Sequence, residues 1–152
     1  HHSYTYVYAT KNVFWNKEAM VARVSGSLFD VWEYYDGYLW QPSAQAMKPV
    51  LSDVSDFFSV FVEGDNVYAL SHGALLAPEI KLHRAHLPED GWQFKKILYC
   101  ENDASGETYA TNAILVKYTK DKLVCSYSRI NADFGKLENT VPRFLDIGNW
   151  NY

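Results

Sequence analysis

Four strand–turn–strand patterns follow one another along the chain, and they constrain the fold more than any other feature of the sequence. Each joins two short runs of β-branched and aromatic residues through an acidic or glycine-containing turn, at residues 36–37, 63–66, 88–91 and 120–122. Such runs are typical of β-strands. Asp36-Gly37 is favoured in tight hairpins because both residue types tolerate positive φ. Consecutive hairpins therefore predict an antiparallel all-β domain.

Helical periodicity is weak throughout. The best candidate for a helix is residues 11–23, but its apolar side chains do not recur at the i, i+3, i+4, i+7 spacing that one helix face requires. We therefore expect no substantial helix.

Two of the hairpins share one layout, which indicates a repeated unit. Residues 57–71 and 113–130 each form an apolar strand, an acidic turn and a second apolar strand that ends in polar residues. Two further predicted strands lie between them, and four antiparallel strands followed by a restart is the layout of a propeller blade. We predict antiparallel, four-stranded, blade-like sheets of a partial β-propeller. Residues 53–107 form one blade and 108–152 start the next; a β-sandwich is the alternative.

A propeller ring usually needs about four to eight blades, and this chain offers two to three. We therefore expect either a homo-oligomer that completes the ring or a chain that is part of a larger one. At 152 residues, positions 1–152 fit a single all-β domain. The histidines at 1–2 look like a remnant of a purification tag and enter no functional argument.

Charge and composition exclude several classes of function. The net charge is −4 and the basic residues are scattered, which argues against a nucleic-acid partner. No apolar stretch approaches the roughly 20 residues that cross a bilayer, so we expect no membrane insertion. Neither cysteine lies at zinc-ligand spacing from another cysteine or a histidine, and we expect no metal and no other cofactor.

Aromatic residues make up 16% of the chain, and tyrosines outnumber phenylalanines 12 to 8. Several rings gather around the turn at 36–37, among them Trp32, Tyr38 and Trp40. A sugar ring buries a face of C–H groups against such side chains, which removes apolar surface from water. We predict that these three residues contact a ligand.

One segment resembles a known family. Residues 82–85, followed by Pro88-Glu89-Asp90-Gly91-Trp92, resemble a degenerate Asp-box hairpin of the sialidase-like propellers, in which an acidic, glycine-containing turn ends in a tryptophan. The likeness extends through 67–73 and 121–129, so that about half of the chain resembles two neighbouring blades of a phage endosialidase tail spike.

The resemblance implies a site across the central face of adjacent blades. In that family an acid precedes the first strand of one blade, and arginines end the second strands of two blades. By position, the acid falls at Asp56, the first arginine is replaced by His72, and the second is Arg129. The resemblance also implies an extracellular or virion-surface location, as in a phage tail fibre.

The sequence thus predicts a carbohydrate-recognition domain that binds an anionic surface glycan. Because the first arginine is missing and the chain is short, we expect binding rather than cleavage. If the protein is an enzyme, it is a glycosidase acting on a capsular polysaccharide, with Asp56 as the acid and with Arg129 and His72 orienting the anionic group. The alternatives are a non-catalytic structural or protein-interaction β-domain and a small lipocalin-like barrel.

Overall fold

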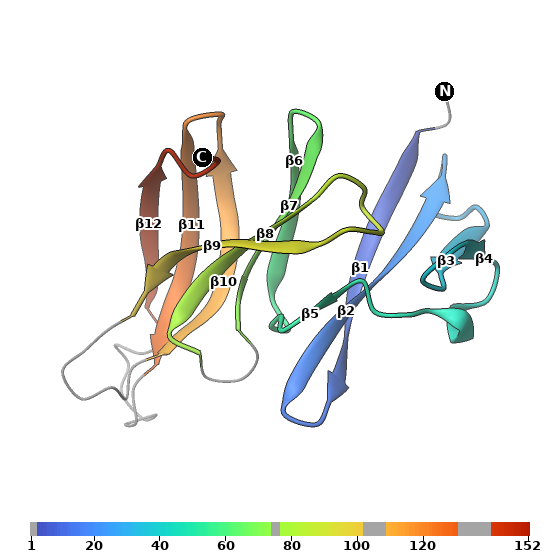
Figure 1. The fold of residues 1–152 in the computed structure, drawn as a ribbon, viewed down its shortest axis with the longest axis horizontal. Helices are drawn as coiled ribbons and strands as arrows, with labels where there is room; N and C mark the ends of the chain where they lie inside the picture. Colours follow the sequence, from blue (N-terminus) through green and yellow to red (C-terminus); the bar gives the residue numbers. More distant parts are fainter. Residues whose placement is uncertain (1–2, 74–76, 102–108, 131–140) are drawn as a thin grey trace.

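The computed structural model describes residues 3–73, 77–101, 109–130 and 141–152, and their regular structure is almost entirely β (Figure 1). The described residues contain no α-helix, only a 3-10 turn, η1 (Ala44–Ala46), and hence no helix long and apolar enough to cross a membrane. The strands are β1 (Tyr4–Val13), β2 (Asn16–Ser25), β3 (Trp32–Tyr35), β4 (Trp40–Gln41), β5 (Leu51–Ser52), β6 (Phe58–Glu63), β7 (Asn66–His72), β8 (Glu79–Ala85), β9 (Gln93–Cys100), β10 (Tyr109–Tyr118), β11 (Lys122–Ile130) and β12 (Pro142–Gly148).

These strands form three antiparallel sheets in chain order. The first has the order β1-β2-β3-β4, with β5 also paired to β2; the second is β6-β7-β8-β9; the third is β10-β11-β12. The all-β prediction is therefore confirmed. The strands of the second sheet lie within residues 53–107 and those of the third within 108–152. None of the three sheets closes into a barrel in the described part of the chain, which argues against the lipocalin-like alternative.

All four predicted hairpins are present. The turn at 36–37 connects β3 to β4, and the other three turns connect β6 to β7, β8 to β9, and β10 to β11. The long hairpin of β1 and β2, by contrast, was not expected from the sequence. Its turn is Phe14-Trp15, with Phe14 at φ 53°, and so it lacks the glycine that usually marks a turn with positive φ.

Neighbouring sheets pack face to face through two apolar clusters. The larger joins the second and third sheets, and its centre is Trp150, which is fully buried among Phe61, Tyr68 and Leu123. The smaller joins the first and second sheets through residues such as Ala19 and Ala69. Because each sheet buries side chains against the next, the stack matches either successive blades or the layers of a sandwich.

Three edge strands meet along one side of the molecule. β1, β6 and β10 each lie at the end of their sheet's strand order, and β6 runs between the other two (Figure 1). Ser59 Oγ on β6 accepts a 2.9 Å hydrogen bond from the backbone N–H of Leu115 on β10. The rings of Tyr8 and Phe58 connect β1 to β6, with their centroids 6.2 Å apart. This convergence of edges positions the candidate site.

Candidate functional site

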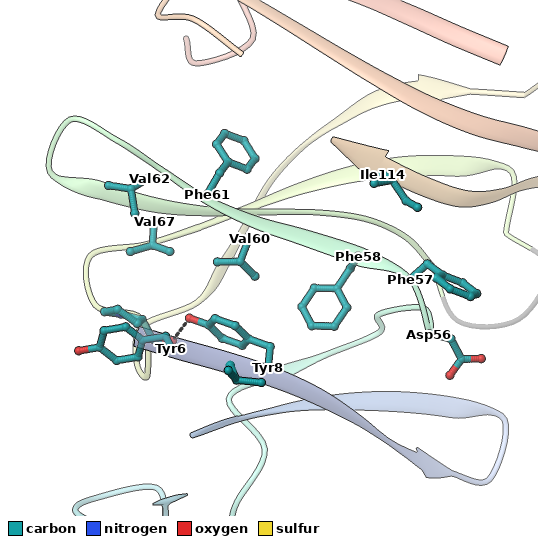
Figure 2. A pocket seen from close by; sticks show the side chains of 12 residues that line it. Tyr6, Tyr8, Asp56, Phe57, Phe58, Val60, Phe61, Val62, Val67 and Ile114 are labelled. Atoms are coloured by element: carbon teal, nitrogen blue, oxygen red, sulfur yellow. Dashed lines mark hydrogen bonds between the residues drawn. The ribbon is translucent and has the colours of Figure 1, made fainter. Parts of the chain in front are cut away.

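A groove of about 570 Å³ lies where these edge strands converge (Figure 2). Apolar side chains of β6 form one wall, Tyr6 and Tyr8 of β1 face them, and Ile114 of β10 contributes from the third sheet. Figure 2 shows Asp56 at the opposite end of the groove from Tyr6. The groove thus has walls of aromatic and aliphatic side chains and a carboxylate, that of Asp56, at one end.

The alternation of β1 explains why two tyrosines face the groove. Side chains two residues apart on a strand point to the same face, which places Tyr6 and Tyr8 together. The Tyr8 hydroxyl donates a 2.6 Å hydrogen bond to the carbonyl oxygen of Pro88, the dashed line in Figure 2. Burial, reinforced by Glu89, raises the pKa of Tyr8, so the hydroxyl remains a protonated donor at neutral pH.

Asp56 belongs to the loop that leads from β5 into β6, and it is ion-paired with Lys17 on β2. The Lys17 side chain is only 17% exposed, whereas that of Asp56 is largely open to solvent. The ion pair therefore joins the first sheet to the loop that precedes the first strand of the second sheet. The Asp56 carboxylate stays accessible to solvent. Asp56 can accept hydrogen bonds from a ligand without losing its counter-ion.

His72 ends β7 and lies close to the same loop. It is buried, and its Nδ1 has no hydrogen-bond partner among the described residues. Burial lowers the pKa of His72, although the carboxylates of Asp56 and Asp53 oppose that shift, so the ring is neutral at pH 7. The structure thus brings His72 into the electrostatic neighbourhood of Asp56, but His72 does not line the groove.

Asp53, in the same loop, was not singled out by the sequence analysis. Its backbone has φ 57°, in the left-handed region, and its carboxylate lies 2.6 Å from Lys81 Nζ on β8. Aspartate tolerates this backbone conformation better than most residues do, which explains how the loop turns there. Nothing in the local sequence separates Asp53 from the other turn aspartates, because its partner is 28 positions away.

Arg129, near the end of β11, pairs with a buried carboxylate rather than with open solvent. Its Nε lies 3.1 Å from Glu101 Oε1, and Glu101 is only 7% exposed. Glu101 also accepts hydrogen bonds from the hydroxyls of Tyr127, at 2.9 Å, and Tyr99, at 3.0 Å. Burial, together with Tyr99 and Glu101, raises the pKa of Tyr127. This cluster is separate from the residues that line the groove.

The three predicted aromatic contact residues lie in different environments. Tyr38 is 89% exposed at the β3–β4 turn. The Trp32 indole N–H donates a 3.1 Å hydrogen bond to the carbonyl of Leu28. Trp40 packs on Tyr6 and on Tyr35, with ring centroids 6.0 Å and 5.3 Å away. The guanidinium of Arg23 lies 4.1 Å from the Trp40 ring centroid. Of the three, Trp40 is therefore the one connected to the groove, through Tyr6.

Comparison with known proteins places the chain in a family. A family profile described as "Domain of unknown function (DUF5005)" matches residues 1–150. The chain belongs to the DUF5005 family. Comparison of this DUF5005 chain with curated proteins gave no match.

Among solved structures, the DUF5005 chain is similar to a protein from Bacteroides ovatus described as a "putative hydrolase". The two structures superpose with a TM-score of 0.70 and 19% sequence identity, over 97% of this chain and 42% of the other. A likeness at this identity shows the fold alone. The chain spans less than half the length of that protein. Neither description refers to a sialidase or a propeller, so those assignments stay predictions.

Proposed function

We propose that this DUF5005 chain is a carbohydrate-binding β-domain that holds a glycan in the groove between β1, β6 and β10. The observation that carries the proposal is the lining itself, in which the rings of Tyr6, Tyr8 and Phe57 lead toward Asp56. Apolar walls with a few placed polar groups are typical of ligand sites. Aromatic rings offer the flat surfaces that sugar C–H faces bury, and a carboxylate accepts hydrogen bonds from hydroxyl groups.

We also propose that the three sheets are successive blades of a β-propeller. Successive antiparallel sheets whose first strands converge support a propeller in which the groove is part of the wall of a central channel. Further blades would come from other copies of the chain or from additional sequence. The greater length of the Bacteroides ovatus protein is consistent with additional sequence.

Within this proposal, binding is favoured over cleavage. Glycoside hydrolysis usually uses two carboxyl groups, about 5–9.5 Å apart, on either side of the scissile bond. Among the described residues that line the groove, Asp56 is the sole carboxylate. The Bacteroides ovatus protein's description as a hydrolase supports testing for cleavage, with Asp56 as the acid. An extracellular or virion-surface location follows from the proposal that the ligand is a surface glycan.

The proposal is tested by glycan-array binding of the wild type and of Phe57→Ala. Phe57 is half-exposed in the groove, so its truncation should leave the fold intact. We expect affinity to fall about two- to tenfold, the effect of losing one aromatic contact. Phe144→Ala is the matched control, because Phe144 is an exposed ring on β12 that does not line the groove. A wild type that binds no glycan, or equal losses in both variants, would contradict the proposal.

A structural or protein-interaction role is the second candidate, and one observation favours it. The edge strands β1, β6 and β10 carry exposed apolar side chains, including Val7, Val62 and Ile114. Exposed sheet edges of this kind are readily covered by another chain. Light scattering separates the candidates, because a stable oligomer without glycan affinity would favour this role over the first.

A further inference from the structure

A second cavity, of about 540 Å³, lies on the flank of the molecule between β5 and strands β8 and β9. The two cavities share no lining residue: Asp56 lines the groove and Asp53 lines this flank cavity. They are neighbours, because Trp92 of the flank cavity packs on Tyr8 of the groove with ring centroids 6.2 Å apart. Its other lining residues include Glu79, Lys81, His83, Trp92 and Phe94. The glycan proposal assigns no role to any of them.

The charges in the flank cavity leave one carboxylate unmatched. Asp53 and Lys81 lie 2.6 Å apart and neutralise each other. Glu79 has no ion-pair partner among the described residues, although it lines the same cavity. The described lining therefore carries a net negative charge, which favours a cationic ligand over an anionic one.

His83 supplies an unpartnered polar group to the cavity wall. It is 5% exposed, and its Nδ1 has no hydrogen-bond partner among the described residues. Burial and the nearby Lys81 lower the pKa of His83, so the ring is neutral at pH 7 and offers one nitrogen as an acceptor. Buried polar groups are normally hydrogen-bonded, and no described protein group satisfies this nitrogen.

Two aromatic rings complete the cavity. Trp92 is half-buried. The exposed Phe94 ring stands edge-on to His83 with the centroids 5.9 Å apart. Aromatic faces attract cations through their quadrupole, and a neighbouring carboxylate reinforces this attraction. The described residues contain no group of three or more metal-ligating side chains, so a metal ion does not fit here.

We propose that the flank cavity binds an organic molecule with a protonated primary amine, of the size of an amino sugar. Glu79 is the counter-ion of the ammonium group, Trp92 and Phe94 contact the body of the molecule, and His83 accepts a hydrogen bond. The site lies outside the groove and does not depend on glycan binding there.

Glucosamine is the probe, with glucose as the uncharged control. In two-dimensional amide NMR, glucosamine should shift signals of β8 and β9, and glucose at the same concentration should not. Glu79→Gln, which keeps the shape and removes the charge, should weaken glucosamine binding about tenfold, as expected for the loss of a charge-assisted hydrogen bond. Glu63→Gln makes the same change on β6, outside both cavities, and should have no effect.

Three results would overturn the assignment. The first is equal binding of glucose and glucosamine, the second is glucosamine shifts confined to groove residues such as Tyr8, and the third is unchanged affinity in Glu79→Gln. Phe57→Ala, the variant that tests the groove, should bind glucosamine like the wild type. The proposal for the flank cavity and the proposal for the groove can therefore be confirmed or contradicted independently.

Discussion

Lys17 on β2 and Asp56 in the loop before β6 form an ion pair that joins the first two sheets at one end of the groove. The lysine is mostly buried and the aspartate mostly exposed. Lys17 therefore fixes the loop to the first sheet, and the Asp56 carboxylate stays exposed at the groove. This arrangement makes Asp56 the residue whose substitution most directly separates binding from catalysis.

Asp56→Asn should leave glycan binding within about twofold of the wild type, because the amide can still accept a hydrogen bond. It should abolish any release of reducing sugar, since an amide cannot transfer the proton that glycosidic cleavage needs. A glycan array and a reducing-sugar assay measure the two effects. Asp65→Asn, in the exposed β6–β7 turn, is the control. Release that survives in Asp56→Asn would exclude Asp56 as the acid.

Arg129→Ala should lower stability, because it leaves the Glu101 carboxylate buried without its counter-ion. It should leave glycan binding in the groove unchanged, because Arg129 does not line the groove. We expect about 1–3 kcal/mol of destabilisation, less than for a fully buried pair because Arg129 is partly exposed. The double variant Arg129→Ala/Glu101→Gln should recover much of that stability in denaturant unfolding. If this folded double variant still binds anionic glycans like the wild type, Arg129 is not an anion clamp.

His72 and His83 should make stability decrease in mild acid. Burial lowers both pKa values below the unfolded value of about 6.5. Below about pH 6.5 the unfolded chain therefore takes up protons that the folded chain does not, and the stability present above that pH is progressively lost. Thermal unfolding between about pH 5 and 7 should show a shallower slope in His72→Gln and in His83→Gln. The exposed His86→Gln is the control and should retain the wild-type slope.

Trp150 should be one of the most sensitive positions for stability. It is fully buried, its indole N–H donates a 2.8 Å hydrogen bond to the carbonyl of Thr119, and its ring centroid lies 4.9 Å from that of Tyr68. Trp150→Ala should cost about 3–5 kcal/mol, measured by denaturant unfolding. Trp15→Ala, at an exposed hairpin tip, should change stability by less than about 0.5 kcal/mol. Similar losses in both variants would contradict the packing described above.

The two cysteines should react at very different rates. Both are free thiols; Cys100 is exposed and Cys125 is buried. Burial raises the pKa of Cys125 to about 11, so at pH 8 its thiol is almost entirely protonated and shielded from reagents. A disulfide-exchange reagent should therefore titrate one thiol rapidly in the native protein and two in denaturant. Two fast thiols under native conditions would contradict the burial of Cys125.

The strands that the sequence predicted are those joined by turns whose own residues favour a turn. Asp36-Gly37, the turn at 63–66 and the turn at 88–91 combine residues suited to turns with flanking apolar runs, and each connects a real hairpin. The hairpin of β1 and β2 lacked such a signal because its turn is Phe14-Trp15. Strand β12 was not predicted as a separate strand from the sequence, and it is held by pairing along β11.

The amino-acid sequence by itself determined the all-β class and the order of the hairpins, because alternation and turn chemistry act over a few residues. Only the tertiary structure decided which charged groups meet: Lys17 with Asp56, Asp53 with Lys81, and Glu101 with Arg129. Each pair is at least 28 positions apart in sequence, and its members come from elements that only sheet packing brings together. Glu79 and His83 lie on one strand, β8, but the cavity that they line also needs β5, β9 and the loop before β6, which only the tertiary structure brings to that strand.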